Sequence, residues 1–261
     1  MLKALSVNAE GKYIYCIIQG NAKQEFHTRG VGGSDRVYTI NFEDLNAVVS
    51  DSPMVRYDIS RENTIAHERV IEEVMQRGFT VLPVRFGTIA QNADQVRERL
   101  LKRRFALLHG LLYWVENKVE LGLKAFWNKE RVFQEILEEE PTIKVYRGAL
   151  AQRSPQATYV ERIELGRMVE AALVAKRDRE AERILAILRP LVDSEDVRVN
   201  AVLTDTMVLN AAFLARRSRE ADFDAQVNAL AEKHTGRLTF KYVGPAPPFN
   251  FVNVVVNWKE E

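Results

Sequence analysis

The side chains best able to carry chemistry are scattered along this sequence. The four histidines stand at positions 27, 67, 109 and 234, and their spacing matches no common pattern of metal ligands. His67-Glu68 matches the start of a zinc-binding helix, but Ile71 stands where such a helix needs its second histidine. We therefore expect no metal site, and we expect each histidine to be a surface or capping residue.

Motifs for nucleophiles and phosphate binding are also missing. The glycine-rich stretch 30–34 has neither the lysine of a P-loop nor Gly-x-Gly-x-x-Gly spacing, so we expect a flexible linker there. The single cysteine, Cys16, excludes an internal disulfide and lies among strand-forming residues, which predicts a buried thiol. Glu72-Glu73 and Glu138–Glu140 have the context of solvated helix faces. The sequence therefore predicts no catalytic residue, no cofactor and no enzymatic activity.

A basic run at Arg97–Arg104 is the strongest local charge anomaly. It admits three interpretations: a solvated helix face, a docking site for an acidic partner helix, or a nucleic-acid contact. The run lacks the interleaved aromatic residues of base-stacking surfaces. The whole chain holds 37 basic and 36 acidic residues, whereas phosphate-binding proteins usually carry a basic excess. We favour the first two interpretations and expect no nucleic-acid partner.

The composition is that of a soluble globular protein, with 46% hydrophobic and 28% charged residues. The most apolar stretch, Phe105–Val115, is much shorter than the roughly 18 residues that a membrane-spanning helix needs. Met1–Glu10 lacks the apolar region of a signal peptide. We therefore expect a cytoplasmic protein with no membrane partner.

Residues 1–117 show strand and helix signals in the order βββαβα, which predicts a first α+β domain. β-branched and aromatic residues mark the strands, while Ser60 and Gly78 are typical of the start and end of a helix. The expected elements are strands at Lys12–Gln19, Val37–Asn41, Leu45–Ser50 and Phe79–Val84, with helices from Ser60 to Gly78 and from Asn92 to Asn117.

Residues 118–261 predict a second domain with the ferredoxin-like order βαββαβ and one extra strand at the end. Its longest element is an amphipathic helix from Pro155 to Arg189, which Pro190 ends. Short helical pieces are expected over 128–154. The other expected elements are strands at Val119–Phe126, Val197–Leu203, Met207–Ala215, Arg237–Val243 and Phe249–Trp258, and a helix at Arg219–His234. The fold class is therefore α+β with two domains.

Two segments differ from ordinary fold patterns. In Val81–Thr88 (V-L-P-V-R-F-G-T), Pro83 removes a backbone donor, which predicts an edge strand or a bulge. Arg85 in this segment either bridges two elements or binds a partner. In Gly244–Val252 (G-P-A-P-P-F-N-F-V), the prolines force an extended connection and two phenylalanines flank Asn250. This segment either closes the core or forms an aromatic partner surface, and we favour the core.

These two motifs, in this order, resemble the gas vesicle protein F/L family (GvpF/GvpL), with the F branch favoured. The stretches Y-I-Y-C-I-I at 13–18 and L-N-A-V-V-S at 45–50 are similar to the first strands of that family. The resemblance extends from about Tyr13 to Trp258. It implies a non-enzymatic accessory or minor structural protein of gas vesicle assembly, located in the cytoplasm and at the gas vesicle.

The resemblance also implies the partners, which are the hydrophobic shell protein GvpA and other gas vesicle accessory proteins. Such a protein would limit the aggregation of GvpA during nucleation, by covering apolar surface at an open sheet edge or face near Phe249–Val256. The residues expected to bind the partner are Arg85, Phe86, Phe249, Asn250 and Phe251. The alternative is a small-molecule-binding or enzymatic α+β protein with a pocket at a sheet face.

Overall fold

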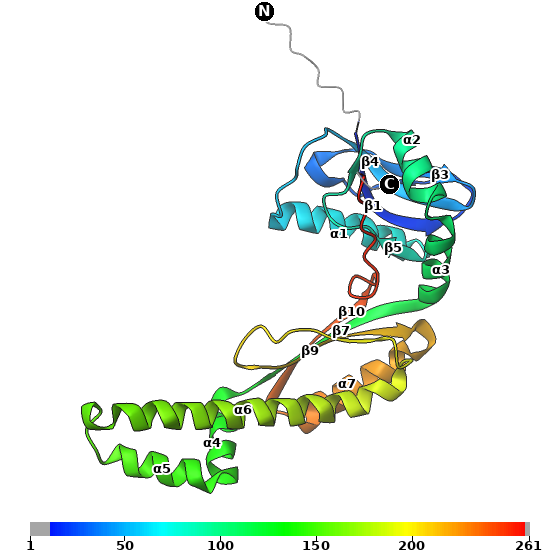
Figure 1. Ribbon diagram of the computed structural model, residues 1–261. Helices are drawn as coiled ribbons and strands as arrows, with labels where there is room; N and C mark the ends of the chain where they lie inside the picture. The colour runs from blue at the N-terminus through cyan, green and yellow to red at the C-terminus, as the bar shows by residue number, and fades with distance from the viewer. Residues whose placement is uncertain (1–10, 259–261) are drawn as a thin grey trace, which may run out of the picture. The chain divides into compact units, whose positions relative to one another are not determined.

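The computed structural model describes residues 11–258, and they form two compact units (Figure 1). The first unit holds the described residues up to Glu120 together with those from Pro245 onward, and the second holds Leu121–Gly244. Over 11–258, no helix is long and apolar enough to cross a membrane. The segment Met1–Glu10, expected to lack a signal peptide, lies outside the described residues.

The sheet of the first unit is built around β1 (Gly11–Gln19). On one side β1 pairs antiparallel with β4 (Leu45–Ser52), and on the other with β5 (Val81–Pro83) and β6 (Ile89–Ala90). Beyond β4 lie β3 (Val37–Phe42) and β2 (Glu25–Phe26). Every residue from Tyr13 to Ile18 is fully buried, including Cys16, so the predicted buried thiol is confirmed.

The helices of the first unit follow the predicted order, with one correction. In α1 (Arg61–Gln76), the Ser60 hydroxyl accepts a hydrogen bond from the Asn63 amide, and Gly78 follows the helix at a φ of 89°. The helix predicted from Asn92 to Asn117 is not continuous. It consists of α2 (Ala93–Gln95), the π-helical η2 (Val96–Lys102) and α3 (Phe105–Val115), with a break inside the basic run.

The glycine-rich stretch 30–34 is not the flexible linker that we expected. It forms the short 3-10 helix η1 (Val31–Gly33), in which Val31 is buried and its amide donates to the Tyr15 hydroxyl. A Cβ atom on Gly30 would collide with the same hydroxyl. The glycine therefore allows the chain to lie directly against the core.

The second unit contains a four-stranded sheet in the order β10-β7-β9-β8, the ferredoxin-like arrangement. Together with the first sheet and the helices, it confirms the α+β fold class. The strands are β7 (Lys118–Trp127), β8 (Val197–Val199), β9 (Met207–Arg216) and β10 (Leu238–Ala246). The α-helices are α4 (Lys129–Glu139), α5 (Pro141–Ala151), α6 (Tyr159–Leu188) and α7 (Glu220–Lys233), with 3-10 turns η3 (Gln156–Thr158), η4 (Arg189–Leu191) and η5 (Arg217–Arg219).

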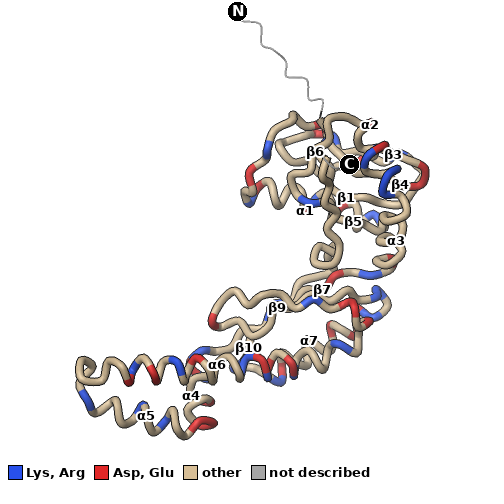
Figure 2. Tube along the Cα trace, in the orientation of Figure 1, with Lys and Arg blue, Asp and Glu red and all other residues tan. Residues whose placement is uncertain are grey.

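Helix α6 confirms the predicted long helix. Its 30 residues make a rod of about 45 Å. Figure 1 shows α5 beside the first half of α6, and Figure 2 shows basic and acidic residues following one another along it. The fully buried apolar residues, Ile184, Leu185 and Leu188, lie in the second half. The apolar stripe predicted along the whole helix is therefore only half-buried in its first part.

The strand predicted at Phe249–Trp258 is wrong. The chain leaves β10 at Ala246, passes through buried Pro247 and Pro248, and makes only a single bridge with Val84, through Val254. The Phe251 and Val252 amides donate to the Pro248 carbonyl instead, so the segment begins with a turn rather than a ladder. These residues belong to the first unit. The division into an N-terminal α+β domain 1–117 and a C-terminal ferredoxin-like domain 118–261 stays a proposal.

One histidine is buried in the core of the first unit, contrary to expectation. The His67 ring is 5% exposed and lies between the rings of Tyr13, Tyr15 and Phe86. The Tyr13 hydroxyl lies 3.1 Å from His67 Nδ1, and the histidine makes a further hydrogen bond with the Val84 carbonyl. The Gly87 amide in turn donates to the Tyr13 hydroxyl at 3.0 Å. His67 and Tyr13 therefore hold the 84–87 segment against the sheet.

A buried ion network ties together α4, α6 and the start of β10 in the second unit. Arg237 donates to Glu135 at 2.7 and 3.0 Å and to Glu180 at 3.0 Å. Glu180 is 2% exposed, and the nearly buried Lys176 lies 3.1 Å from Glu135. Each buried charge has an oppositely charged partner, and the attraction between them offsets the free-energy cost of removing the charges from water.

The first prediction concerns acid stability. Burial lowers the pKa of His67 to about 4, below its value in an unfolded chain. Between about pH 6.5 and pH 4, the unfolded chain binds a proton at this histidine and the folded protein does not. The free energy of unfolding should therefore fall by about 3 kcal/mol over this range and show no contribution from His67 to its pH dependence above it. Urea unfolding at several pH values should show that His67→Gln flattens this dependence. The control His27→Gln, at an exposed position, should keep it. Parallel pH profiles for the native protein and His67→Gln would contradict the assignment.

The second prediction concerns the ion network. Arg237→Met leaves Glu180 buried without its closest cation, which should cost about 3 kcal/mol of unfolding free energy. Arg189→Met is a matched control, because Arg189 makes a two-bond pair with Glu182 on an exposed surface. That control should cost at most about 1 kcal/mol. Equal losses for both variants, measured by urea unfolding, would show that burial does not set the strength of this network.

Candidate partner-binding site

The V-L-P-V-R-F-G-T segment forms a bulge at the edge of the first sheet. The Val84 amide donates to Tyr15 and the Ile14 amide donates to Thr88, both at 2.9 Å, so only residues 85–87 leave the line of β1. Inside the bulge, the Thr88 hydroxyl donates to the Arg85 carbonyl at 2.6 Å. Gly87 turns the chain with a φ of 78°. Pro83 predicted an edge strand or a bulge: it lies in β5, at the end of the strand order, and the bulge follows it at residues 85–87.

The C-terminal segment 247–258, which we call the C-terminal strap, lies along this bulge. The Val254 amide donates to the Pro83 carbonyl at 3.0 Å, and the Arg85 amide donates to the Val254 carbonyl at 3.1 Å. These two bonds form the bridge between Val84 and Val254, which runs parallel. The two sequence motifs that stood out, far apart in the chain, are therefore in direct contact.

Three of the five residues expected to bind a partner attach the strap to the first unit. Phe249 packs on the core cluster that also contacts Phe86. The Asn250 amide and side chain donate to the buried carboxylate of Glu120 at 2.7 and 2.5 Å. Burial raises the pKa of Glu120, and the bonds from Asn250 oppose that rise. The ring of Phe251 meets Trp114 edge-on at 6.3 Å.

Two residues of the basic run hold the C-terminal strap by hydrogen bonds. Arg99 donates to the Trp258 carbonyl at 3.1 Å, and Arg104 donates to the Val255 carbonyl at 2.7 Å. Two other members of the run form helical ion pairs, Arg97 with Asp94 and Lys102 with Glu98. Arg99 and Arg104 therefore bind the C-terminal strap of the same chain, a role that none of the three interpretations included. Sequence reasoning missed their role because their acceptors lie at the other end of the chain.

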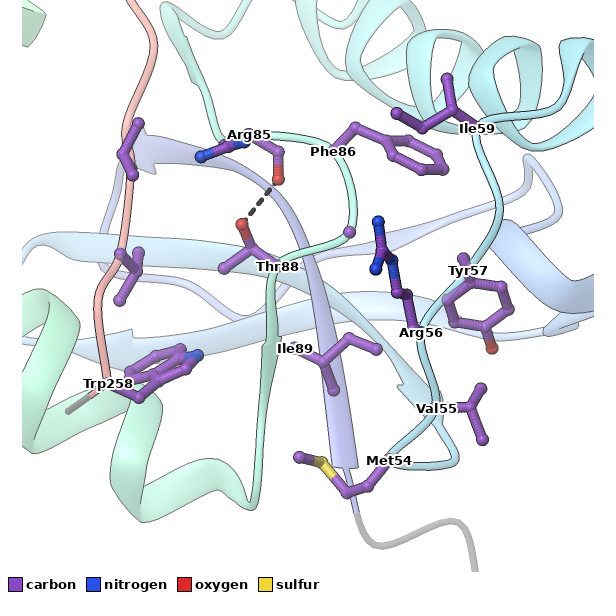
Figure 3. Close-up of a pocket in the computed structure, with 13 residues that line it drawn as sticks. Met54, Val55, Arg56, Tyr57, Ile59, Arg85, Phe86, Thr88, Ile89 and Trp258 are labelled. Atoms are coloured by element: carbon purple, nitrogen blue, oxygen red, sulfur yellow. Dashed lines mark hydrogen bonds between the residues drawn. The ribbon is translucent and has the colours of Figure 1, made fainter.

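A hollow of about 580 Å³ lies between the bulge, the segment 54–59 and the end of the strap (Figure 3). We call it the first-unit groove. Met54, Val55 and Ile59 are 56%, 49% and 86% exposed, although each is apolar. The apolar side chains that line the groove are Met54, Val55, Tyr57, Ile59, Phe86, Ile89, Val255, Val256 and Trp258. An exposed apolar surface of this kind is typical of an interaction site.

The only charged residues that line the first-unit groove are Arg56 and Arg85. Both are exposed, and neither side chain has a hydrogen bond or an ion pair with any residue of 11–258. Figure 3 shows the Arg56 guanidinium in the hollow, between Phe86 and Tyr57. The lining holds no carboxylate, histidine or cysteine. Its chemistry is therefore the recognition of apolar and anionic groups.

Of the expected partner-binding residues, Arg85 and Phe86 line the groove, while Phe249, Asn250 and Phe251 hold one of its walls in place. The segment 54–59 was missed at the sequence level. The signal available there was a set of large apolar residues, Met54, Val55 and Ile59, in a stretch with no strand or helix pattern.

The second unit has a hollow of about 590 Å³ beside α4 and α6, which bears on the small-molecule alternative. Arg177 lies over the ring of Trp127 at 5.8 Å on its wall. The lining charges have both signs, and the lining contains no histidine, cysteine or serine. Across 11–258, no cluster of three or more histidine, cysteine or acidic side chains has the arrangement of a metal site.

The third prediction tests the attachment of the strap. Asn250→Ala removes one donor from a buried carboxylate, which should lower the unfolding free energy by about 2 kcal/mol. Asn253→Ala is the matched control, because Asn253 is an exposed residue of the same strap. Urea unfolding measures both variants. A loss for Asn250→Ala no larger than that for Asn253→Ala would mean that the Glu120 contact does not hold the strap.

Comparison with known proteins gives one consistent result. The family model described as gas vesicle synthesis protein GvpL/GvpF matches residues 11–253. Gas vesicle protein F of Nostoc sp. is 28% identical, with 94% of this chain and 99% of that protein covered. Gas vesicle protein F of a Streptomyces species is 31% identical over 80% of this chain and 84% of its own.

A solved structure agrees with these sequence relatives. The crystal structure of the gas vesicle protein GvpF from Anabaena sp. superposes with a TM-score of 0.82 at 27% identity, and the match covers 94% of this chain and 99% of that one. The α+β fold described above is therefore shared over almost the full length of that protein. The sequence, the fold and the two motifs agree: the chain belongs to the GvpL/GvpF family of gas vesicle proteins.

Proposed function

We propose that this protein is a non-enzymatic accessory protein of gas vesicle assembly that binds the hydrophobic shell protein GvpA in the cytoplasm and limits its aggregation during nucleation. Family membership supports the link to gas vesicles. The observation that carries the binding role is the first-unit groove, where Met54, Val55 and Ile59 present apolar side chains to solvent.

The physical basis is the behaviour of an apolar wall subunit in water. A subunit destined for a gas-facing wall exposes apolar surface before it is incorporated, and such surface aggregates. The groove has room for a few side chains of a partner, each contributing about 2 kcal/mol on full burial. Part of that gain is offset by the entropy of association.

The binding residues fall into two groups under this proposal. Arg85 and Phe86 contact the partner, together with the segment 54–59. Phe249, Asn250 and Phe251 act indirectly, because they fix the strap whose Val255 and Trp258 form the opposite wall. Removing the whole strap is a poor test of binding, since it would also uncover the core of the first unit. Point substitutions at exposed groove positions avoid that problem.

The fourth prediction tests this function. GvpA is diluted from denaturant into buffer, and its turbidity is followed with and without an equimolar amount of this protein. The native protein should suppress the turbidity. Met54→Ser with Ile59→Ser should lose at least about half of that effect, because both side chains are exposed and apolar.

The matched control is Val145→Ser with Tyr159→Ser, a pair equally exposed in the second unit (72% and 69%). This control should suppress turbidity as the native protein does, and thermal melting should show all variants folded. Equal suppression by the groove variant and the native protein would rule out the groove as the binding surface. Failure of the native protein to suppress turbidity would rule out the function.

A further inference from the structure

We infer that the first-unit groove selects apolar segments that carry a carboxylate, which Arg56 and Arg85 bind. This inference rests on the proposed function for its choice of groove, and it adds the chemistry that distinguishes one bound segment from another. Apolar walls alone would accept any hydrophobic segment, whereas two unpaired cations among those walls favour an acidic one.

Arg56 and Arg85 stand out because they line the groove without an acidic partner. Some exposed arginines of the first unit are paired, such as Arg36 with Glu25 at 2.6 Å and Arg97 with Asp94 at 2.8 Å. Others are unpaired among residues 11–258 but lie outside the groove, namely Arg61, Arg69 and Arg103. Arg56 and Arg85 have no such partner among residues 11–258. The groove therefore presents two uncompensated positive charges and no competing acid in its lining.

The apolar walls of the groove would strengthen an ion pair between its arginines and a carboxylate of the partner. A partner that covers the apolar walls would remove water from the guanidinium groups, and attraction between opposite charges increases as the local dielectric falls. Arginine presents a planar set of donors that matches a carboxylate with two parallel bonds. In Figure 3 the Arg56 guanidinium points into the hollow, on the side of Phe86 and Tyr57.

Other anionic partners fit less well. A nucleic acid would require a longer basic surface, and the nearby basic run is occupied by the strap and by helical ion pairs. The exposed apolar residues on both sides of the cations call for a partner whose charge is adjacent to hydrophobic side chains. An apolar peptide segment with acidic residues meets both requirements.

The test uses two synthetic peptides with the same alternating Ile, Val and Ala sequence and neutral Ser-Gly ends. One peptide carries two glutamates and the other carries glutamines at the same positions. Fluorescence anisotropy of labelled peptide measures the dissociation constant for the native full chain. The glutamate peptide should bind about tenfold more tightly at low salt, and the difference should shrink as salt rises.

The variants are Arg56→Gln, Arg85→Gln and their combination. Each single change should weaken binding of the glutamate peptide about threefold, and the double variant should bind both peptides equally. Arg69→Gln is the matched control, because Arg69 is exposed on α1 and does not line the groove. It removes the same charge and should leave the preference intact. Thermal melting should show that all variants fold, since neither groove arginine makes an internal side-chain bond.

Several outcomes would overturn the inference. Equal affinity of the two peptides for the native protein would do so, as would no measurable binding of either peptide or an undiminished preference in the double variant. A loss of preference in Arg69→Gln as large as in the double variant would show a general charge effect. The proposed function is tested separately: if the double variant has no peptide preference but suppresses GvpA turbidity normally, the selectivity holds for peptides and is not used by GvpA. If the native protein prefers the acidic peptide but leaves GvpA turbidity unchanged, the function fails and the selectivity stands.

Discussion

The structure of the first unit depends on the pairing of the C-terminal strap with the bulge that follows β5. Two backbone hydrogen bonds make that pairing, from Val254 to Pro83 and from Arg85 to Val254. They join the end of the chain to an edge segment whose inner side already pairs with β1. Without this contact, the groove would lack one wall and the core beneath Phe249 would be open to water.

Hydrogen bonds from three groups of side chains stabilise that pairing. In the core, His67 bonds the Val84 carbonyl and the Tyr13 hydroxyl accepts from the Gly87 amide. These bonds fix the backbone at both ends of the bulge. Arg99 and Arg104 donate hydrogen bonds to carbonyl groups of the strap that water would otherwise hydrate. Asn250 adds an anchor on buried Glu120. The result is an exposed apolar groove whose walls are held by hydrogen bonds, and preorganisation of this kind favours the binding proposed for it.

The sequence was most informative where a short stretch decides its own structure. The apolar run of β1, the Ser60 cap and Gly78 end of α1, the alternation of β7 and the length of α6 were all predictable, because each signal lies within the element. The edge position of Pro83 in β5 was predictable for the same reason. Local signals also explain the errors: Phe249–Trp258 has the composition of a strand, but its place is set by contacts with residues more than a hundred positions away.

The groove itself could be predicted only in part. Arg85 and Phe86 stood out in their motif, whereas Arg56 and Ile59 became visible only once the fold placed their segment opposite the strap. Hydrogen-exchange mass spectrometry of the protein with and without GvpA tests the central claim most directly. Slower amide exchange over residues 54–59 and 255–258 on addition of GvpA is the result that this account predicts. Unchanged exchange there, or protection found only within 121–244, would contradict it.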